Sequence, residues 1–418
     1  MRARALALLE EVERGRRLDV AWEGAAPTLS PAERGWVQEA VYGTLRLRGR
    51  LDFLLGLHLT RGLDSVPPPL LRILRLGAYQ LFQMGSVPAY AAVSESVELA
   101  KSVGGAKGAG LVNAVLRALA LAGTGPERFP DFAVDPVANL STWGSHPRWL
   151  VERWVARFGA EGARPIVEAG NRIPELFFRP VGLGPREAAD RLEAAGIAPE
   201  PGPEGSRTLR LPRGTDPRAA LAASPGIIQD PSASSVVGFA SPQRGWRVAD
   251  LCAAPGGKGI GMMDLGALVV GADPSPARLL RMRDALRRLG LPERLAVARA
   301  EAPPFRELDM ALVDAPCTGT GTLARHPDAR WRLGADAPEE MARVQARILE
   351  GAASAVRTGG VLVYATCTLE EEENEGTVRS FLSGHPDFRL DGNPGILRVL
   401  PGGDRTDGAF AARLRKES

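Results

Sequence analysis

Cysteine is scarce in this chain, with three thiols in 418 residues. Such a small and odd number excludes a framework of disulfides and is typical of a protein from a reducing compartment. No uncharged apolar run reaches the roughly 20 residues that a membrane-spanning helix needs. The first residues form a short apolar stretch followed at once by acids, which does not fit a signal peptide. The sequence therefore predicts a cytoplasmic protein with no membrane partner.

Lysine is also scarce. The chain has 52 basic and 49 acidic residues, for a net charge of +3, but its lysines are only Lys101, Lys107, Lys258 and Lys416. The planar head of arginine suits phosphate and base recognition. A GC-rich genome, in which arginine codons replace lysine codons everywhere, is the simpler explanation of the ratio. The arginine excess alone does not indicate RNA binding.

The length and the 44% hydrophobic content predict two or three domains, each with its own core. Residues 1–125 are predicted to be an all-helical bundle. The i, i+3, i+4, i+7 spacing of a buried helix face is clear in Val112, Val115, Leu116 and Leu119.

Residues 126–239 are predicted to form a linker followed by a small α/β module. The linker is rich in proline and includes a helix around Trp149–Phe158. The module alternates short strands with helices, and its predicted elements are Leu176–Arg179, Pro185–Ala195, Thr208–Leu211, Pro217–Ala223 and Ile227–Asp230.

Residues 240–418 show the alternation of strands and helices that is typical of a doubly wound parallel sheet, a Rossmann-like domain. Ligands bind such sheets at the carboxyl ends of the strands. The predicted strands are Arg247–Leu251, Ala267–Ala272, Met310–Val313 and Gly360–Tyr364, and helices are predicted at Ala277–Leu289 and Pro338–Val356.

A glycine-rich loop, DLCAAPGGK at 250–258, follows the first of these strands. Gly256 and Gly257 allow the backbone to approach a ligand closely. Asp273 ends the next strand, where a carboxylate accepts hydrogen bonds from ribose hydroxyls. Glu301, further along the chain, is predicted to face an adenine amino group. The loop alone is weak evidence for a nucleoside site, and Asp273 strengthens it.

Two of the three cysteines end similar phrases, Asp314-Ala-Pro-Cys317 and Tyr364-Ala-Thr-Cys367. A lone cysteine at a strand end is usually a buried, inert thiol. Two such cysteines in one sheet domain, beside a nucleoside loop, indicate covalent chemistry on a poorly reactive substrate.

DLCAAPGGK, DAPCTGTG, RHPDARW and YATCTLEEEENE together resemble the RNA cytosine-C5 methyltransferases that use S-adenosylmethionine. LRLGAYQLF and KGAGLVNAVLRAL resemble the NusB-like RNA-binding bundle. SHPRWLVERW and the Gln229–Ser234 stretch resemble the family's linking region. The resemblance covers nearly the whole chain, and it implies binding of S-adenosylmethionine and RNA.

The resemblance also implies roles for individual residues. A thiolate must add to C6 of the cytosine so that C5 becomes nucleophilic. A carboxyl group must hydrogen-bond to N3 and protonate it, and a base must remove the C5 proton. Cys367 matches the family's nucleophile, Cys317 the residue needed for product release and Asp314 the pocket carboxyl, with Lys258 nearby. The implied cofactor contacts are Cys252, Ala253, Ala254, Pro255, Gly256, Gly257, Lys258, Asp273, Glu301 and Asp314; no metal is implied.

Other residues near the cysteines are predicted to contact RNA or solvent. The Thr318–Gly321 loop is small enough to admit a flipped base, and His326, Arg330 and Trp331 are predicted to line the RNA channel. For Trp331, core packing is an equal alternative. The acidic run Glu370–Glu373 is predicted to be a solvated face, and Asn374-Glu375 to cap the helix that positions Cys367.

Two departures from the family pattern concern the cofactor. Gly259 stands where threonine is usual, and Glu301 where aspartate is usual. The departures predict that cofactor binding is kept with an altered affinity.

Alternative functions remain at this stage. DNA cytosine methyltransferases use the Pro-Cys thiol as nucleophile and lack the Thr-Cys partner, so the two thiols favour RNA. A transfer RNA substrate shares the catalytic motifs, and a non-catalytic NusB-like binding factor would need no thiols. The resemblance of the helical bundle to the NusB-like module implies 16S ribosomal RNA as the substrate. The expected protein is a monomer whose RNA binding weakens with salt, and the sequence does not indicate which cytosine it modifies.

Overall fold

The computed structural model describes residues 1–403 and 405–417. Its contacts divide the chain into two units, Met1–Arg172 with Leu323–Ala335, and Ile173–Thr322 with Asp336–Ser418. Residues 126–172 thus group with the helices and the small module groups with the sheet, so the division falls within the 126–239 stretch that was predicted to be a linker and a small α/β module. Among the described residues, no helix is long and apolar enough to cross a membrane.

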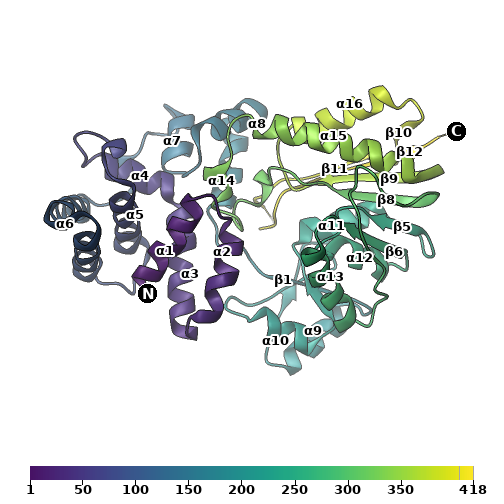
Figure 1. The fold of residues 1–418 in the computed structure, drawn as a ribbon, viewed down its shortest axis with the longest axis horizontal. Coiled ribbons are helices and arrows are strands. Elements are labelled where there is room, and N and C mark those ends of the chain that lie inside the picture. Colours follow the sequence, from purple (N-terminus) through teal and green to yellow (C-terminus); the bar gives the residue numbers. More distant parts are fainter. Residues whose placement is uncertain (404, 418) are drawn as a thin grey trace. The chain divides into compact units, whose positions relative to one another are not determined.

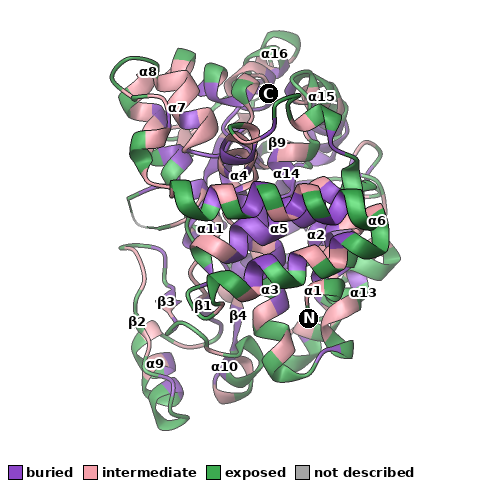
Figure 2. Cartoon of the chain, turned by 90° about the vertical axis from the view of Figure 1, so that its left-hand side faces the viewer, coloured by how far each residue is buried: buried purple, intermediate pink, exposed green. Residues whose placement is uncertain are grey.

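The first unit is helical, as predicted (Figure 1). α5 supplies its centre, since nearly every residue from Leu70 to Gln80 is buried, and Figure 2 shows this helix in the colour of buried residues. Gly105, where φ is 58°, interrupts α6. The helices are α1 (Arg2–Glu13), α2 (Leu18–Ala25), α3 (Pro31–Arg46), α4 (Arg48–Gly56), α5 (Pro68–Gln83), α6 (Ala89–Ala122), α7 (Pro136–Thr142) and α8 (Arg148–Gly170).

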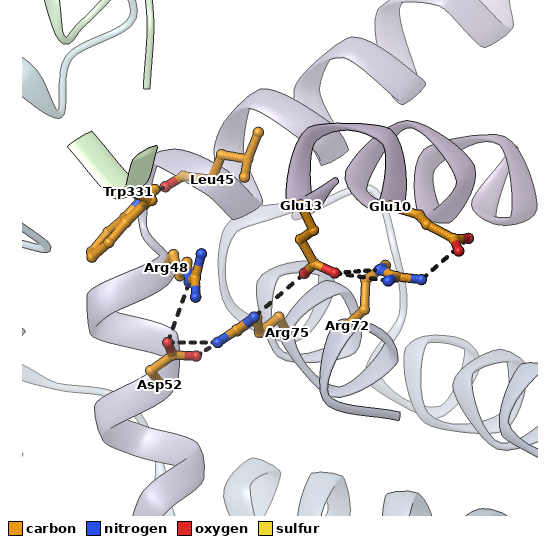
Figure 3. A network of polar contacts seen from close by, with 8 residues as sticks. All are labelled: Glu10, Glu13, Leu45, Arg48, Asp52, Arg72, Arg75 and Trp331. Atoms are coloured by element: carbon orange, nitrogen blue, oxygen red, sulfur yellow. Dashed lines mark hydrogen bonds and ion pairs between the residues drawn. The ribbon is translucent and has the colours of Figure 1, made fainter. Parts of the chain in front are cut away.

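A chain of ion pairs ties α1, α4 and α5 together (Figure 3). Arg72 lies 2.7 Å from Glu13, and Arg75 reaches both Glu13 at 3.5 Å and Asp52 at 2.6 Å. The two arginine side chains are only 11% and 10% exposed. Because the charges are partly shielded from water and form a network, they contribute more than isolated surface pairs.

Residues Leu323–Ala335 lie between two strands of the sheet domain in sequence, but they fold within the helical unit. α14 (Ala329–Arg332) is the centre of this segment. Trp331 Nε1 donates to the carbonyl of Leu45 at 2.6 Å, and the amide of Leu18 donates to Asp328 Oδ2 at 3.3 Å. The segment is therefore held by groups from the N-terminal helices.

Arg330 fixes this segment most firmly, with a side chain that is fully buried. Its guanidinium donates to the carbonyls of Arg46 at 3.2 Å and Gly170 at 2.7 Å, which are the last residues of α3 and α8. Carbonyls at a helix C-terminus lack partners within the helix and carry the negative end of its dipole. The buried cation is thus balanced by helix ends, with further acceptors at Ser145, Asn171 and Leu323.

The second unit begins with the small module, an antiparallel sheet in the order β2-β3-β1-β4 flanked by two helices. Its Arg179 is buried against Gly261 in the first helix after the glycine-rich loop, and donates to Gln229 Oε1 at 3.2 Å. The elements are β1 (Phe177–Pro180), α9 (Pro185–Ala194), β2 (Glu200–Pro201), β3 (Leu209–Arg210), α10 (Pro217–Ala223) and β4 (Gly226–Ile228).

The larger sheet has the order β10-β12-β9-β8-β5-β6-β7, with β11 also paired to β12. The strands from β9 to β7 are parallel, as predicted, but β10, β11 and β12 pair antiparallel and were not predicted. The strands are β5 (Arg247–Asp250), β6 (Leu268–Asp273), β7 (Leu295–Val297), β8 (Leu308–Asp314), β9 (Val356–Thr366), β10 (Phe388–Leu390), β11 (Ile396–Val399) and β12 (Ala409–Lys416).

Side chains alternate between the two faces of the parallel strands. In β8, Ala311 and Val313 pack with α15 and α16, whereas Met310 and Leu312 pack with α11 and α12. Helices therefore cover both faces, as Figure 1 shows for this unit. The helices are α11 (Pro231–Ala240), α12 (Gly257–Asp264), α13 (Pro276–Arg288), α15 (Ala337–Ala355) and α16 (Thr377–Gly384).

The anchoring role of Arg330 predicts a specific loss of stability. Arg330→Lys should lower the free energy of unfolding by about 2–4 kcal/mol, because an ammonium group cannot reach all the carbonyls and each one left unpaired costs roughly 1–3 kcal/mol. Urea denaturation followed by tryptophan fluorescence measures the change. Arg61→Lys, at an exposed position of the same unit, should change it by less than about 0.5 kcal/mol. Equal stability of the two variants would contradict the anchoring role.

Candidate active site

The carboxyl ends of four parallel strands bring the predicted site residues to one edge of the sheet. Asp250, Asp273 and Asp314 are the last residues of β5, β6 and β8, and Cys367 directly follows β9. The register pairs Asp250 with Leu312 and Asp314 with Ala365. Parallel pairing therefore gathers groups that are more than a hundred residues apart in sequence.

The glycine-rich loop turns sharply from β5 into α12. Gly256 precedes the helix with φ at 111°, a region that side chains rarely adopt, and a Cβ there would lie 2.7 Å from Met282. A Cβ on Gly257 would lie 2.8 Å from Gln229 Nε2. These glycines are therefore required by the packing of the loop, in addition to the close ligand approach predicted from the sequence.

Gly259, one of the two departures from the family pattern, lies against Asp250. A Cβ at this position would be 2.9 Å from Asp250 Oδ2, so the absence of a side chain leaves room for the carboxyl group. Burial, followed by the charge of Asp314, raises the pKa of Asp250 to about 7. Hydrogen bonds from the amides of Cys252 and Gly259 act in the opposite direction.

Asp273 has the chemistry expected of a ribose acceptor. Its side chain is fully buried, and Oδ1 accepts from the amide of Ser275 at 2.9 Å. Oδ2 has no hydrogen-bond partner, although Arg278 Nη1 lies 3.2 Å away. A buried carboxylate oxygen with free acceptor capacity fits a ligand hydroxyl.

Cys252 lies where the carboxyl groups of the loop region converge. Burial, followed by the charges of Asp250, Asp314, Asp273 and Glu301, raises the pKa of its thiol. Cys252 therefore stays protonated, as expected of a packing residue. Glu301 lies in the turn after β7, with its side chain 28% exposed and 3.4 Å from Arg299.

Lys258 and Asp314 form an ion pair at the mouth of the loop. Lys258 Nζ donates to Asp314 Oδ2 at 2.6 Å, and the two side chains are 14% and 34% exposed. Burial lowers the pKa of Lys258, but the charge of Asp314, its hydrogen bond and the nearby Cys367 outweigh burial and raise it overall. Lys258 therefore carries a positive charge close to Cys367.

The two strand-end cysteines are in contact. Cys317 Sγ lies 3.4 Å from Cys367 Sγ, and both thiols are free of disulfides. The hydrogen bond to Cys367 and burial, followed by the charges of Cys367 and Glu373, raise the pKa of Cys317 well above that of an ordinary thiol. In this pair, Cys317 is therefore the thiol that keeps its proton.

The loops that carry the cysteines approach each other closely. The amide of Gly321 donates to the carbonyl of Cys367 at 3.0 Å, and Gly408 donates to Gly321 at 2.8 Å. A Cβ on Gly321 would lie 2.7 Å from the Cys367 carbonyl oxygen. Glycine at 321 is thus required for the two loops to pair. The hydroxyl-bearing Thr318 and Thr320 of the same loop are buried, so they are not open to a base in this structure.

The prediction that Glu370–Glu373 is a solvated face is wrong at both ends of the run. Glu370 is 3% exposed and Glu373 is fully buried, because their carboxylates accept hydrogen bonds from threonines beside the cysteines. Asn374 is also buried and bonds to Thr366 and Thr368 rather than capping a helix. The threonine next to each cysteine was the available signal, but a charge run does not reveal which of its members is buried.

The residues predicted to contact RNA lie in the Leu323–Ala335 segment of the helical unit. Arg330 is fully buried with its Nη1 and Nη2 donating to protein oxygens, and Trp331 is bonded to Leu45. These positions give both residues a structural role and offer Arg330 no path to an RNA phosphate. His326 is partly buried, and burial lowers the pKa of its imidazole. Within residues 1–403 and 405–417, no cluster of three metal-ligating side chains was found.

Comparison with protein families accounts for each part of the chain. Residues 239–415 match the family described as "16S rRNA methyltransferase RsmB/F". Residues 1–121 match the NusB family. Residues 146–217 match the "Methyltr_RsmF/B-like, ferredoxin-like domain". The three matches agree with the predicted helical bundle, small module and methyltransferase sheet.

Curated proteins and solved structures extend this likeness over the full length. A Bacillus subtilis "Probable ribosomal RNA small subunit methyltransferase B" is 33% identical over 93% of this chain and 92% of its own length. The Cronobacter sakazakii "Ribosomal RNA small subunit methyltransferase B" is 31% identical over 99% and 97%.

Among solved structures, PH0851 covers 98% of this chain and 97% of its own length with a TM-score of 0.79 at 24% identity, which shows the shared fold. A "Methyltransferase Homolog Protein from Pyrococcus Horikoshii" covers 67% of this chain and 98% of its own, with a TM-score of 0.57 at 26% identity. With full-length relatives above 30% identity and a shared domain order, the chain belongs to the family of ribosomal RNA small subunit methyltransferase B.

Proposed function

We propose that this protein transfers a methyl group from S-adenosylmethionine to C5 of a cytosine in 16S ribosomal RNA, through a covalent bond between Cys367 and C6 of the base. The observation that carries the proposal is the pair of sulfurs 3.4 Å apart, next to the Lys258–Asp314 ion pair at the carboxyl edge of the sheet. The names of the full-length relatives support the small-subunit RNA as substrate.

The first step needs a thiolate, and the arrangement favours Cys367. Cys317 keeps its proton and hydrogen-bonds to its neighbour, while the charged Lys258 lies near Cys367 and stabilises a negative sulfur. The Cys367 sulfur donates an electron pair to C6, the C5–C6 π electrons become available at C5, and N3 takes a proton. Asp314 is assigned to N3 as the carboxyl group that passes it a proton from the Lys258 ammonium group, to which it is hydrogen-bonded.

The cofactor residues present fit S-adenosylmethionine. The free Oδ2 of buried Asp273 suits a ribose hydroxyl, Glu301 the adenine, and the Cys252–Lys258 loop the remainder of the molecule. When bound, S-adenosylmethionine supplies an electrophilic methyl group on sulfur. The Cys252–Lys258 loop follows β5 and Asp314 ends β8, so the residues that would hold the cofactor lie at the same edge of the sheet as the carboxyl group assigned to N3.

Release of the product is assigned to Cys317. Removal of the C5 proton returns its electron pair to the C5–C6 bond, the bond from C6 to Cys367 breaks, and Cys367 leaves as a thiolate. A base for this step must lie beside the nucleophile, and Cys317 is in contact with it. Once Cys367 is bonded to C6, Cys317 passes its own proton to solvent, and the thiolate that remains takes the C5 proton while N3 returns its proton to Asp314. The raised pKa of Cys317 makes this thiolate a strong base.

The helical unit matches the NusB family and is proposed to bind the RNA, with the protein acting as a monomer. Arg330 is not part of this proposal because it is buried, whereas the partly buried His326 remains a candidate contact. A transfer RNA substrate and a non-catalytic binding role are the alternatives that the first experiment below distinguishes.

Replacing each thiol separately should stop the reaction at a different point. With labelled S-adenosylmethionine and 16S RNA, Cys367→Ala should form no denaturant-resistant adduct and lose methyl transfer by about 10³-fold or more, as expected for a nucleophile. Cys317→Ala should instead accumulate the adduct, because the bond to Cys367 forms but is not broken. Gel electrophoresis under denaturing conditions measures the adduct.

The double variant Cys317→Ala/Cys367→Ala is the matched control and should form no adduct. Accumulation in Cys367→Ala rather than Cys317→Ala would reverse the assigned roles. Methylation of transfer RNA but not of 16S RNA by the wild type would favour the transfer RNA alternative, and methylation of neither would favour the binding factor.

Asp273→Asn tests the cofactor site. The amide keeps the volume and the bond to Ser275 but places a donor where Oδ2 accepts, so the dissociation constant for S-adenosylmethionine should rise about 10- to 100-fold, in line with ~1.5–3 kcal/mol for a hydrogen bond to a charged group. Titration calorimetry measures the constant. Asp284→Asn, at an exposed position on α13, should leave it unchanged, and equal affinities for the two variants would argue against Asp273 as a cofactor ligand.

A further inference from the structure

The polypeptide on both sides of Cys317 is connected to one buried carboxylate, directly on one side and through Gln345 on the other. The amide of Thr318 donates to Glu373 Oε2 at 2.9 Å. Gln345 Nε2 donates to the same oxygen and to the carbonyl of Pro316, each at 2.9 Å. The residues before and after Cys317 are thus connected through Glu373 and Gln345, both fully buried.

The next residue, Asn374, does the same for the other cysteine. Thr366 Oγ1 donates to Asn374 Oδ1 at 2.5 Å, and Asn374 Nδ2 donates to the carbonyl of Thr368 at 3.0 Å. One amide side chain therefore bonds to the residues immediately before and after Cys367. Its exposure is only 3%, so water does not compete for these bonds.

We call the hydrogen bonds of Glu373 and Gln345 the bracket around Cys317, and those of Asn374 the bracket around Cys367. Glu373 and Asn374 both lie in one irregular turn. Glu372–Gly376 is a π-helical turn ahead of α16, a distortion that occurs frequently at functional sites. Tyr364 donates its hydroxyl proton to the Glu373 carbonyl at 2.5 Å, which fastens the turn to β9. Thr368 Oγ1 donates to Glu373 Oε1 at 3.0 Å and connects the two brackets.

We propose that Glu373 and Asn374 are positioning residues that hold the two thiols separately, Glu373 fixing Cys317 for product release and Asn374 fixing Cys367 for attack on the base. The assignment of steps rests on the proposed function. Neither side chain bonds to a sulfur, so each acts through the backbone and the threonines that flank its cysteine.

The chemistry of Glu373 makes it hard to replace. A carboxylate only accepts hydrogen bonds, and its two oxygens receive bonds from Thr318, Thr368 and Gln345. In Glu373→Gln, one oxygen becomes an NH₂ group that must face some of these donors. The variant has almost the same volume but loosens the bracket around Cys317.

The test is single-turnover kinetics on 16S RNA with labelled S-adenosylmethionine, following formation and decay of the covalent adduct. Glu373→Gln should slow adduct decay about 10- to 100-fold, and Asn374→Ala should slow adduct formation by a similar factor, the size expected for a misplaced reacting group. The KM for S-adenosylmethionine should stay within about twofold in both. Glu371→Gln, in the same run but exposed and paired with Arg379, should behave as wild type.

A merely structural role would slow formation and decay equally in both variants, and that result would overturn the proposal. So would unchanged kinetics. Should Glu373→Gln fail to fold, Thr318→Val removes one bond of the same bracket and should also slow decay selectively.

A second readout needs no substrate. In the RNA-free protein, Glu373→Gln should label Cys317 with iodoacetamide about 10-fold faster than wild type, because the loop is freed and the negative charge beside the thiol is gone. Peptide mass spectrometry identifies the labelled cysteine. If the wild type transfers no methyl group but Cys317 labelling responds, the proposed function fails and the bracket stands. Unchanged labelling contradicts the bracket.

Discussion

The parallel pairing of β8 with β9 is the constraint on which the site depends. Asp314 pairs with Ala365, and Ala315 donates to the Ala365 carbonyl at 2.8 Å, so the loops that leave these strands begin side by side. Two cysteines fifty residues apart in sequence then reach a sulfur–sulfur distance of 3.4 Å. The sheet brings the two loops together, and the buried polar groups of the turn after Cys367 then fix the positions of the two sulfurs. Loops alone would not hold two thiols at van der Waals contact, since their own conformational freedom is large.

In the helical unit, a buried cation rather than strand pairing holds a loop segment in place. Leu323–Ala335 follows the Cys317 loop in sequence and is built into the helices around Arg330. Burial, followed by the charge of Arg46, lowers the pKa of Arg330 to about 9, because a cation loses its hydration at this position. The C-terminal carbonyls of α3 and α8 compensate for the lost hydration. The chain between the two cysteines therefore belongs to both units, because Leu323–Ala335 folds within the helical unit and the residues on each side of it fold within the sheet unit.

Much of the fold was predictable because periodicity is local. The helical bundle, the strands β5, β6, β8 and β9, and the carboxyl edge with Asp250, Asp273 and Asp314 follow from patterns within ten to twenty residues. The antiparallel strands β10 to β12 were missed because the predicted alternation of strands and helices ends before them. The burial of Glu373 and Arg330 was not predictable, because a charged side chain is buried only when partners distant in sequence satisfy it. Here those partners are Thr318 and Gln345 for Glu373. For Arg330 they are the carbonyls of Arg46, Ser145, Gly170 and Leu323 and the side-chain oxygen of Asn171.

The central claim is that Cys367, and not Cys317, bonds to the cytosine. The most direct measurement uses 16S RNA transcribed with 5-fluorocytidine, in which the C5 substituent cannot leave as a proton, so the wild-type enzyme remains attached after methyl transfer. Proteolysis and tandem mass spectrometry then identify the modified cysteine. The account predicts a nucleotide adduct on the peptide that contains Cys367. An adduct on Cys317, or methylation of unmodified 16S RNA with no adduct on the fluorinated RNA, would contradict it.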